Sequence, residues 1–206
     1  MEDFRPRRTA APLCARRPGT ALNPIFAAAA EIQAACTAAH FEFCFIGGLA
    51  VQRWGEPRMT RDVDMTLLTG FGGEERIVEQ LLDIFSGRLS DAKEFALRNR
   101  VLLLKATNGV PLDISLGAMP FEERTIERSS LFDLGGGTGL RTCSAEDLIV
   151  HKVFAGREKD WEDVRGIIAR QSALNAPLIW TELLPLLELT GNTSAETRLR
   201  DLLGQA

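Results

Sequence analysis

Apolar residues fall into two kinds of pattern along this chain, which together predict an α/β (α+β) fold. Short apolar runs bounded by turn residues are typical of strands, and they occupy residues 43–46, 101–106 and 110–115. Apolar residues at helical spacing lie at 74–85, 161–168, 177–189 and 194–203. We therefore predict a small mixed sheet flanked by helices, with further helices in the C-terminal part.

Capping residues and turns locate several of these elements. Asn23-Pro24 is expected to begin a helix that runs to about His40, with Asn as cap and Pro at the first position. Ser144, followed three residues later by Asp147, begins a helix that ends near Ala155. Gly87 is expected to end the helix at 74–85. Asn108-Gly109 between two apolar runs predicts a β-hairpin.

Residues 117–142 show no clear periodicity and are expected to be irregular. The run Gly135-Gly136-Gly137-Thr138-Gly139 lies within this segment. It lacks the Gly-Lys-Ser/Thr ending of a phosphate-binding loop and leads into a strand, so a flexible hairpin turn is the better interpretation.

Composition is that of an ordinary globular protein, with 206 residues, 25% charged residues and a formal net charge of −4. No apolar run approaches the ~18 residues that span a bilayer, and we expect a cytoplasmic protein. Residues 1–20 form a basic leader that is expected to be disordered, or alternatively to touch RNA. Residues 21–143 would form the core, and 144–206 a helical part that completes the cleft.

Cysteine and histidine contribute little to the expected chemistry. The four cysteines have no Cys-x-x-Cys spacing, so they are interpreted as buried or incidental reduced thiols. His40 and His151 are too far apart to suggest a metal site. His151 could approach a nucleotide, although a position on a helix surface is the simpler interpretation.

The candidate chemistry begins between residues 43 and 68. A strand there breaks at Gly47-Gly48, where a helix starts and free backbone N–H groups favour phosphate. The next strand opens with Asp62-Val63-Asp64, so the two acids share one face. Adjacent carboxylates are tolerated when a cation lies between them. Carboxylates for a metal beside a glycine turn suggest a nucleotide site.

A third acid follows from strand parity. After the turn at Asn108-Gly109, Val110, Leu112 and Ile114 face one way, while Asp113 faces the other. If this strand lies beside the one that carries Asp62 and Asp64, the three carboxylates converge. Taken alone, Asp-x-Asp is more often a solvent-facing feature of an edge strand.

These residues resemble the DNA polymerase beta-like nucleotidyltransferase superfamily, and most closely its minimal AbiEii-type, toxin-like branch. The resemblance covers about residues 40–170. It rests on Gly47-Gly48, on Arg58-Met59-Thr60-Arg61-Asp62-Val63-Asp64, and on a Lys-x-x-Ala…Arg…Asp pattern within 152–163. One departure is Gly48, because the wider superfamily usually has serine there. The absence of the serine hydroxyl leaves the backbone amides to contact phosphate.

The resemblance implies metal-dependent transfer of a nucleoside monophosphate (NMP) from a nucleoside triphosphate (NTP) to an acceptor hydroxyl. The implied ligands of Mg²⁺ (or Mn²⁺) are Asp62, Asp64 and Asp113, which with Lys152 would be the catalytic residues. The implied nucleotide contacts are Gly47, Gly48, Arg58, Thr60, Lys152, Arg157, Lys159 and Asp160. Lys152 is expected to be replaceable without loss of thermal stability. Asp160 and Asp163 also suit a solvated helix face or an ion pair with Arg157.

The acceptor and partners stay open at this point. The family suggests RNA, with the tRNA 3′ end as one candidate, and a cognate antitoxin protein as partner. Alternatives are a small-molecule transferase of the antibiotic-modifying kind, a protein-modifying transferase, and an inactive module that binds NTP or a partner. The inactive module would be favoured if Asp113 lay far from Asp62 and Asp64.

Overall fold

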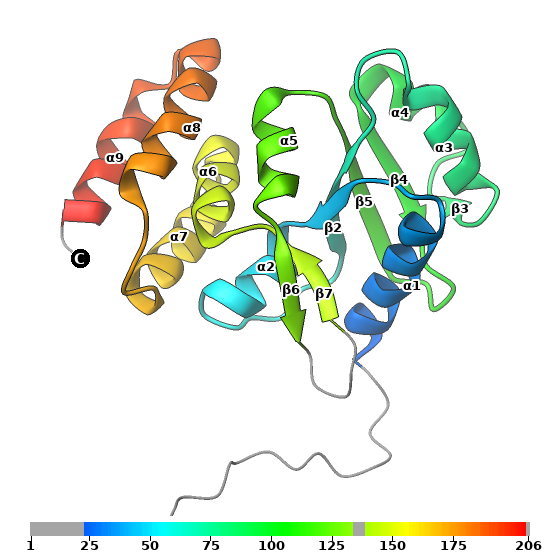
Figure 1. Ribbon diagram of the computed structural model, residues 1–206, viewed down its shortest axis with the longest axis horizontal. Coiled ribbons are helices and arrows are strands. Elements are labelled where there is room, and N and C mark those ends of the chain that lie inside the picture. Colours follow the sequence, from blue (N-terminus) through cyan, green and yellow to red (C-terminus); the bar gives the residue numbers. More distant parts are fainter. Residues whose placement is uncertain (1–22, 134–138, 205–206) are drawn as a thin grey trace, which may run out of the picture.

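The computed structural model describes residues 23–133 and 139–204 (Figure 1). The basic leader at 1–20 and the centre of the glycine run lie outside these residues. A mixed sheet of seven strands crosses the described part of the molecule in the order β3-β4-β5-β2-β1-β7-β6. The strands are β1 (Phe43–Phe45), β2 (Val63–Leu68), β3 (Ser86–Gly87), β4 (Val101–Lys105), β5 (Pro111–Gly117), β6 (Ser130–Asp133) and β7 (Gly139–Thr142).

Helices cover both faces of this sheet. They are α1 (Pro24–Ala38), α2 (Gly47–Trp54), α3 (Glu74–Leu82), α4 (Ala92–Asn99), α5 (Pro120–Glu127), α6 (Ala145–Ala155), α7 (Glu158–Arg170), α8 (Ala176–Thr190) and α9 (Thr193–Gly204). The last four follow one another in the C-terminal part, from yellow to red in Figure 1. The predicted mixed sheet with flanking helices and a helical C-terminal part is therefore confirmed.

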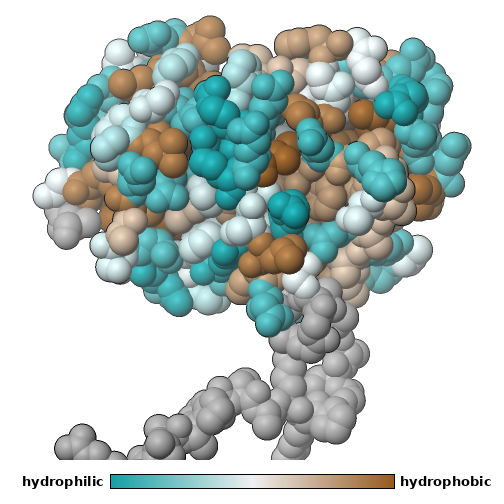
Figure 2. Space-filling view, viewed as in Figure 1, coloured by the Kyte–Doolittle hydropathy of each residue, from teal (hydrophilic) through white to brown (hydrophobic). Residues whose placement is uncertain are grey.

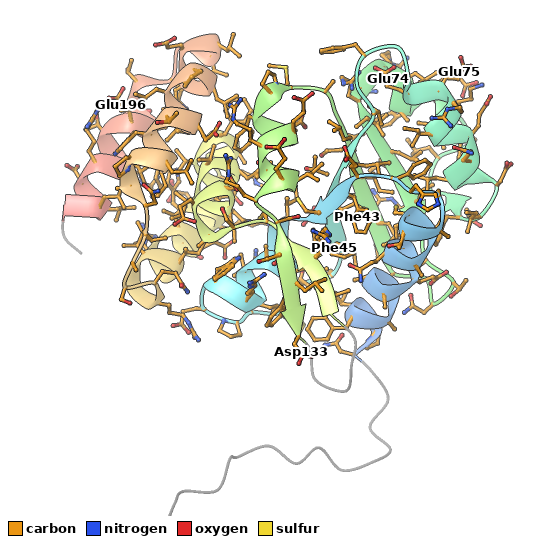
Figure 3. The ribbon with its side chains drawn as sticks, in the orientation of Figure 1. Phe43, Phe45, Glu74, Glu75, Asp133 and Glu196 are labelled. Atoms are coloured by element: carbon orange, nitrogen blue, oxygen red, sulfur yellow. The ribbon has the colours of Figure 1, made fainter. Side chains whose placement is uncertain are left out.

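Two hydrophobic clusters hold the layers together. Apolar residues of α1, α3 and α4 pack against one face of the sheet. On β1, Phe43 and Phe45 belong to this cluster, with their rings edge to face at 6.1 Å (Figure 3). A second cluster joins α2, α5 and the four C-terminal helices beside Cys44 and Cys143. Burial of apolar surface on both faces of the sheet fixes the strands that carry the acids.

Caps and turns lie largely where the sequence predicts them. The Asn23 side chain accepts a hydrogen bond from the amide of Ile25, and Ser144 Oγ accepts one from Asp147. β4 and β5 form an antiparallel hairpin across Asn108-Gly109. β6 and β7 are also antiparallel, and the glycine run connects them.

Two expectations about elements are wrong, and one helix was not anticipated. α3 ends at Leu82, and Gly87 lies in the short strand β3 instead of ending the helix. α4 is a helix that the sequence reading did not assign, and its last residue is followed by Arg100 in the left-handed conformation (φ 55°). The segment 117–142 is not irregular, because it contains α5 and two strands. Short elements of this kind have too few turns for periodicity to reveal them.

Ion pairs tie α5 to the C-terminal helices. Arg124 pairs with Glu182 of α8 at 2.6 Å, and Arg128 pairs with Asp147 of α6 at 2.6 Å. The outer side of α5 carries exposed Glu123 and Glu127, and hydrophilic residues gather over this helix in Figure 2. α5 thus bridges the sheet and the helical part that follows it.

Two further expectations can be compared with the described residues. No helix among them is both long enough and apolar enough to cross a membrane. Cys36, Cys44 and Cys143 are buried free thiols, as predicted for these three. Burial raises the pKa of Cys36 to about 12 and that of Cys44 to about 12. Thiols of this kind stay protonated and serve as small apolar side chains.

Candidate active site

Three aspartates meet at adjacent ends of two parallel strands. Asp64 of β2 and Asp113 of β5 are direct partners in the ladder. Asp62 lies just before β2, which begins at Val63 and not at Asp62 as expected. Carboxylate oxygens of the three residues lie within 4.8 Å of one another. The convergence predicted from strand parity is therefore present, and the condition that favoured an inactive module is not met.

The electrostatics of this cluster suit a divalent cation. Burial raises the pKa of the Asp64 carboxyl, and the neighbouring charge of Asp62 raises it further. Burial also raises the pKa of Asp113, although the Arg88 guanidinium opposes this effect. Such crowding disfavours three negative charges unless a cation is shared. Carboxylate oxygens are the ligands that Mg²⁺ prefers, so this donor set fits the implied metal.

Glycine is required at residue 47 by its surroundings. Gly47 has φ of +55°, and a Cβ built there would lie 2.0 Å from Asp64 Oδ2. The Gly48 amide donates a long hydrogen bond (3.5 Å) to the same oxygen. α2 begins here without a side-chain cap, so its first N–H groups face a negatively charged site.

The hydroxyl missing at residue 48 is replaced by one from another segment. A Cβ on Gly48 would lie 2.4 Å from Thr60 Oγ1. Thr60 therefore fills the space that a serine at residue 48 would need, and its hydroxyl donates to Asp62 Oδ1 at 3.1 Å. The Thr60 hydroxyl, an implied nucleotide contact, therefore lies beside the backbone amide of Gly48 at the start of α2.

Lys152 is buried, contrary to expectation. Only 5% of its surface is exposed, and its Nζ lies 3.0 Å from Asp160 Oδ1 and 2.8 Å from Asp163 Oδ2. Both acids are buried as well, so the solvated face suggested for them is wrong. The helix that carries them packs against the rest of the C-terminal part, and charged residues are tolerated there because they are paired.

Two arginines complete this network. Arg58 donates to both oxygens of Asp163 at 2.7 and 2.9 Å. Arg157 pairs with Asp160 at 2.6 Å, as the sequence suggested. Burial alone would raise the pKa values of Asp160 and Asp163, but hydrogen bonds from the lysine and the arginines outweigh it and hold both below the ordinary range. Three cations and two anions leave the network with surplus positive charge.

A cavity of about 320 Å³ joins the acids to this network. It brings together the implied metal ligands and every residue implied in nucleotide binding: Gly47, Gly48, Arg58, Thr60, Asp62, Asp64, Asp113, Lys152, Arg157, Lys159 and Asp160. Arg53 of α2 does not line this cavity. It donates instead to Ser130 O and Thr142 Oγ1.

Two residues of the cavity or the cluster, Phe154 and Arg88, were not anticipated from the sequence. His151, which the sequence allowed either near a nucleotide or on a helix surface, is half-buried and lines the cavity with Phe154. Arg88 pairs with Asp113 at 2.9 Å. Helical spacing links His151 to Phe154 and could have revealed that pair. Arg88 follows a two-residue strand, and no pattern in the sequence marks it.

Comparison with known proteins agrees with this geometry. The family model described as "Nucleotidyl transferase AbiEii toxin, Type IV TA system" matches residues 34–203. No curated protein matches the sequence.

Three solved structures are similar to this chain at low identity. An antigenic nucleotidyltransferase-like protein from Paracoccidioides brasiliensis is 16% identical, with a TM-score of 0.50 over 85% of this chain and 91% of that one. The antibiotic-resistance factor ANT(2'')-Ia in solution is 17% identical, with a TM-score of 0.47 over 81% and 93%. A crystal structure of ANT(2")-Ia with adenylyl-2"-tobramycin is 19% identical, with a TM-score of 0.48 over 78% and 95%.

The family match covers most of the sequence, and the clustered acids are those that the family resemblance implies. Asp62, Asp64 and Asp113 thus stand together in a chain that belongs to the AbiEii family of nucleotidyltransferase toxins.

Proposed function

We propose that this chain transfers an NMP from an NTP to an acceptor hydroxyl in the cytoplasm and releases pyrophosphate. The observation that carries the proposal is the cluster of three carboxylates within 4.8 Å, in the same cavity as the start of α2 and the Arg58–Lys152–Arg157 network. The carboxylates would lie at the reacting α-phosphate, with the metal ion between them, and the cations would lie at the phosphates that leave as pyrophosphate.

In the reaction, the acceptor oxygen attacks the α-phosphorus, and the bond from this phosphorus to the oxygen that bridges to the β-phosphorus breaks. Pyrophosphate takes the electron pair of that bond. Asp113 is the proposed acceptor of the hydroxyl proton, since burial raises its pKa above that of an ordinary aspartate. Lys152, Arg58 and Arg157 would offset the charge that develops on the leaving pyrophosphate.

Asp62, Asp64 and Asp113 would hold Mg²⁺ or Mn²⁺. Bound there, a divalent ion would supply a Lewis acid that stabilises charge on the attacking and leaving oxygens. The Thr60 hydroxyl, hydrogen-bonded to Asp62, would orient that carboxylate and contact phosphate. Gly47 and Gly48 would place backbone amides at the same phosphate.

The proposed acceptor is the 3′ hydroxyl of an RNA, with tRNA as the leading candidate, and the proposed partner is a cognate antitoxin protein. Both follow from membership of a toxin family and not from any contact in the cavity. A small-molecule acceptor would use the same acids and is therefore an outcome of the test below.

The test is incubation of the purified protein with Mg²⁺, each of the four α-labelled NTPs, and total RNA. Label should enter RNA with the parent protein and with Asp201→Asn, a control variant of an exposed aspartate on α9. It should be absent with Asp64→Asn and in excess EDTA. Label in RNA that survives EDTA, or equal labelling by Asp64→Asn, would refute the proposal. If the RNA stays unlabelled and a small molecule from an added cell extract becomes labelled, the acceptor belongs to the small-molecule class.

A further inference from the structure

One part of the cavity wall has no role in the proposed phosphate and metal chemistry. His151 and Phe154 both line the cavity and lie three residues apart on α6. Residues at this spacing are neighbours on a helix surface. Phe154 leaves 45% of its surface exposed, although a large apolar side chain gains free energy by being covered. An uncovered aromatic ring beside an active site is a candidate contact for a ligand.

His151 is unusual in a different way. Its Nε2 atom is buried and has no hydrogen-bond partner among the described residues. Its ring packs against Phe121 with the ring centroids 4.9 Å apart. Burial lowers the pKa of His151 to about 4, so the ring is neutral at physiological pH. A buried polar group without a partner costs stability, and such a group therefore calls for an explanation.

We propose that His151 and Phe154 form the nucleobase subsite of this cavity, a proposal that rests on the proposed function. The face of Phe154 would stack on the base of the incoming NTP. The neutral imidazole of His151, whose Nε2 is buried and unpartnered within the described part of the chain, would turn this atom toward the cavity and form a hydrogen bond with the edge of that base. A nucleoside triphosphate is then recognised at two places, through its phosphates by the cations and through its base by these two side chains.

The chemistry of the two side chains favours a base over a phosphate. Phenylalanine has no hydrogen-bond donor, and a neutral imidazole offers no positive charge to a phosphate. Arg58, Lys152 and Arg157 already supply cations in the same cavity. Stacking on an aromatic ring accepts every base, so selectivity between bases would come from His151.

The first experiment measures binding of NTPs and of inorganic tripolyphosphate, both with Mg²⁺, by calorimetry. Phe154→Ala should raise the Kd for NTPs about ten-fold or more, since this is the usual effect of losing one stacked base. Binding of tripolyphosphate should not change. Phe71→Ala is the matched control, because Phe71 is 74% exposed and lies outside the cavity. That variant should leave both affinities as they are.

The second experiment tests His151 through selectivity and stability together. His151→Leu removes no hydrogen bond of Nε2, so its Tm should equal or exceed that of the parent. Its affinities for the four NTPs should become more alike than those of the parent.

The subsite is wrong if Phe154→Ala weakens NTP and tripolyphosphate equally, or weakens neither. It is also wrong if His151→Leu keeps the selectivity of the parent among the four bases. A parent protein that binds neither NTP nor tripolyphosphate would overturn the proposed function itself, and the subsite with it.

Discussion

Replacement of Asp64 by asparagine should give a protein that is more stable than the parent in the absence of metal. In the presence of metal, the same variant should be less stable than the parent. The substitution keeps the shape of the side chain and removes the charge that takes part in two of the three repulsions in the cluster. Charges 4.8 Å apart, the upper limit of the separations in this cluster, repel by about 1 kcal/mol at the dielectric constant of water and by about 3.5 kcal/mol at an effective dielectric constant of about 20.

The three side chains are half-buried, and Arg88 offsets part of the charge on Asp113. We therefore expect a net gain of about 1–2 kcal/mol for the metal-free variant. For a domain of this size, that gain corresponds to a rise in Tm of roughly 3–6 °C.

Addition of Mg²⁺ should reverse the order of the two proteins. A ligand at one hundred times its Kd stabilises the folded state by about 2.7 kcal/mol. The parent should gain this amount, whereas the variant has lost one carboxylate ligand and should gain much less. Thermal melts with EDTA and with a series of Mg²⁺ concentrations would measure both effects.

Asp201→Asn serves as the control for the change of one charge, and its melts should follow those of the parent. A fall in Tm of several degrees for metal-free Asp64→Asn would refute the reasoning, because it would show that the carboxylate stabilises the fold. An unchanged response to Mg²⁺ would refute the assignment of Asp64 as a ligand.

Three other predictions follow from the surroundings of the cavity. Lys152→Ala should lower the free energy of unfolding, measured in urea, by roughly 1–3 kcal/mol. This is less than the usual ~3–5 kcal/mol for a broken buried ion pair, because Asp160 and Asp163 each keep an arginine. An unchanged free energy of unfolding would contradict this prediction. The depressed pKa values of Asp160 and Asp163 contribute stability that is present above about pH 4 and is lost as the pH falls through those pKa values. The free energy of unfolding of Asp160→Asn should therefore fall less steeply below pH 4 than that of the parent. Equal slopes of this free energy against pH would be the contrary result. Gly48→Ser should lower Tm because its Cβ would lie 2.4 Å from Thr60 Oγ1 and 2.8 Å from Thr60 Cβ. Thr60→Ala removes the first contact and keeps the second, so it should restore part of the lost Tm in the double variant; additive losses would show that the two positions are independent.

Sequence patterns predicted the parts of the site that depend on strand geometry. The position of Asp113 followed from alternation after Asn108-Gly109, and the structure places it beside Asp64. Alternation is a property of the strand itself, so no knowledge of distant contacts was needed.

Burial of charge was not predictable in the same way. Lys152, Asp160 and Asp163 look like solvated residues in the sequence, and only the packing of α6 against α7 brings them together. The pairing of Arg88 with Asp113 likewise depends on how β3 and β4 align. Local periodicity carries no information about such contacts between elements.

The order of the strands has a consequence for the protein during its synthesis. Asp64 and Asp113 become neighbours only when β5 joins β2, and the cation network needs residues as far along the chain as Asp163. A ribosome that adds about 5–20 residues per second therefore exposes Gly47-Gly48 and Asp62 several seconds before the residues that complete the site. A nascent chain on the ribosome holds separate fragments of the cavity, so the cavity is complete only after translation has passed α7.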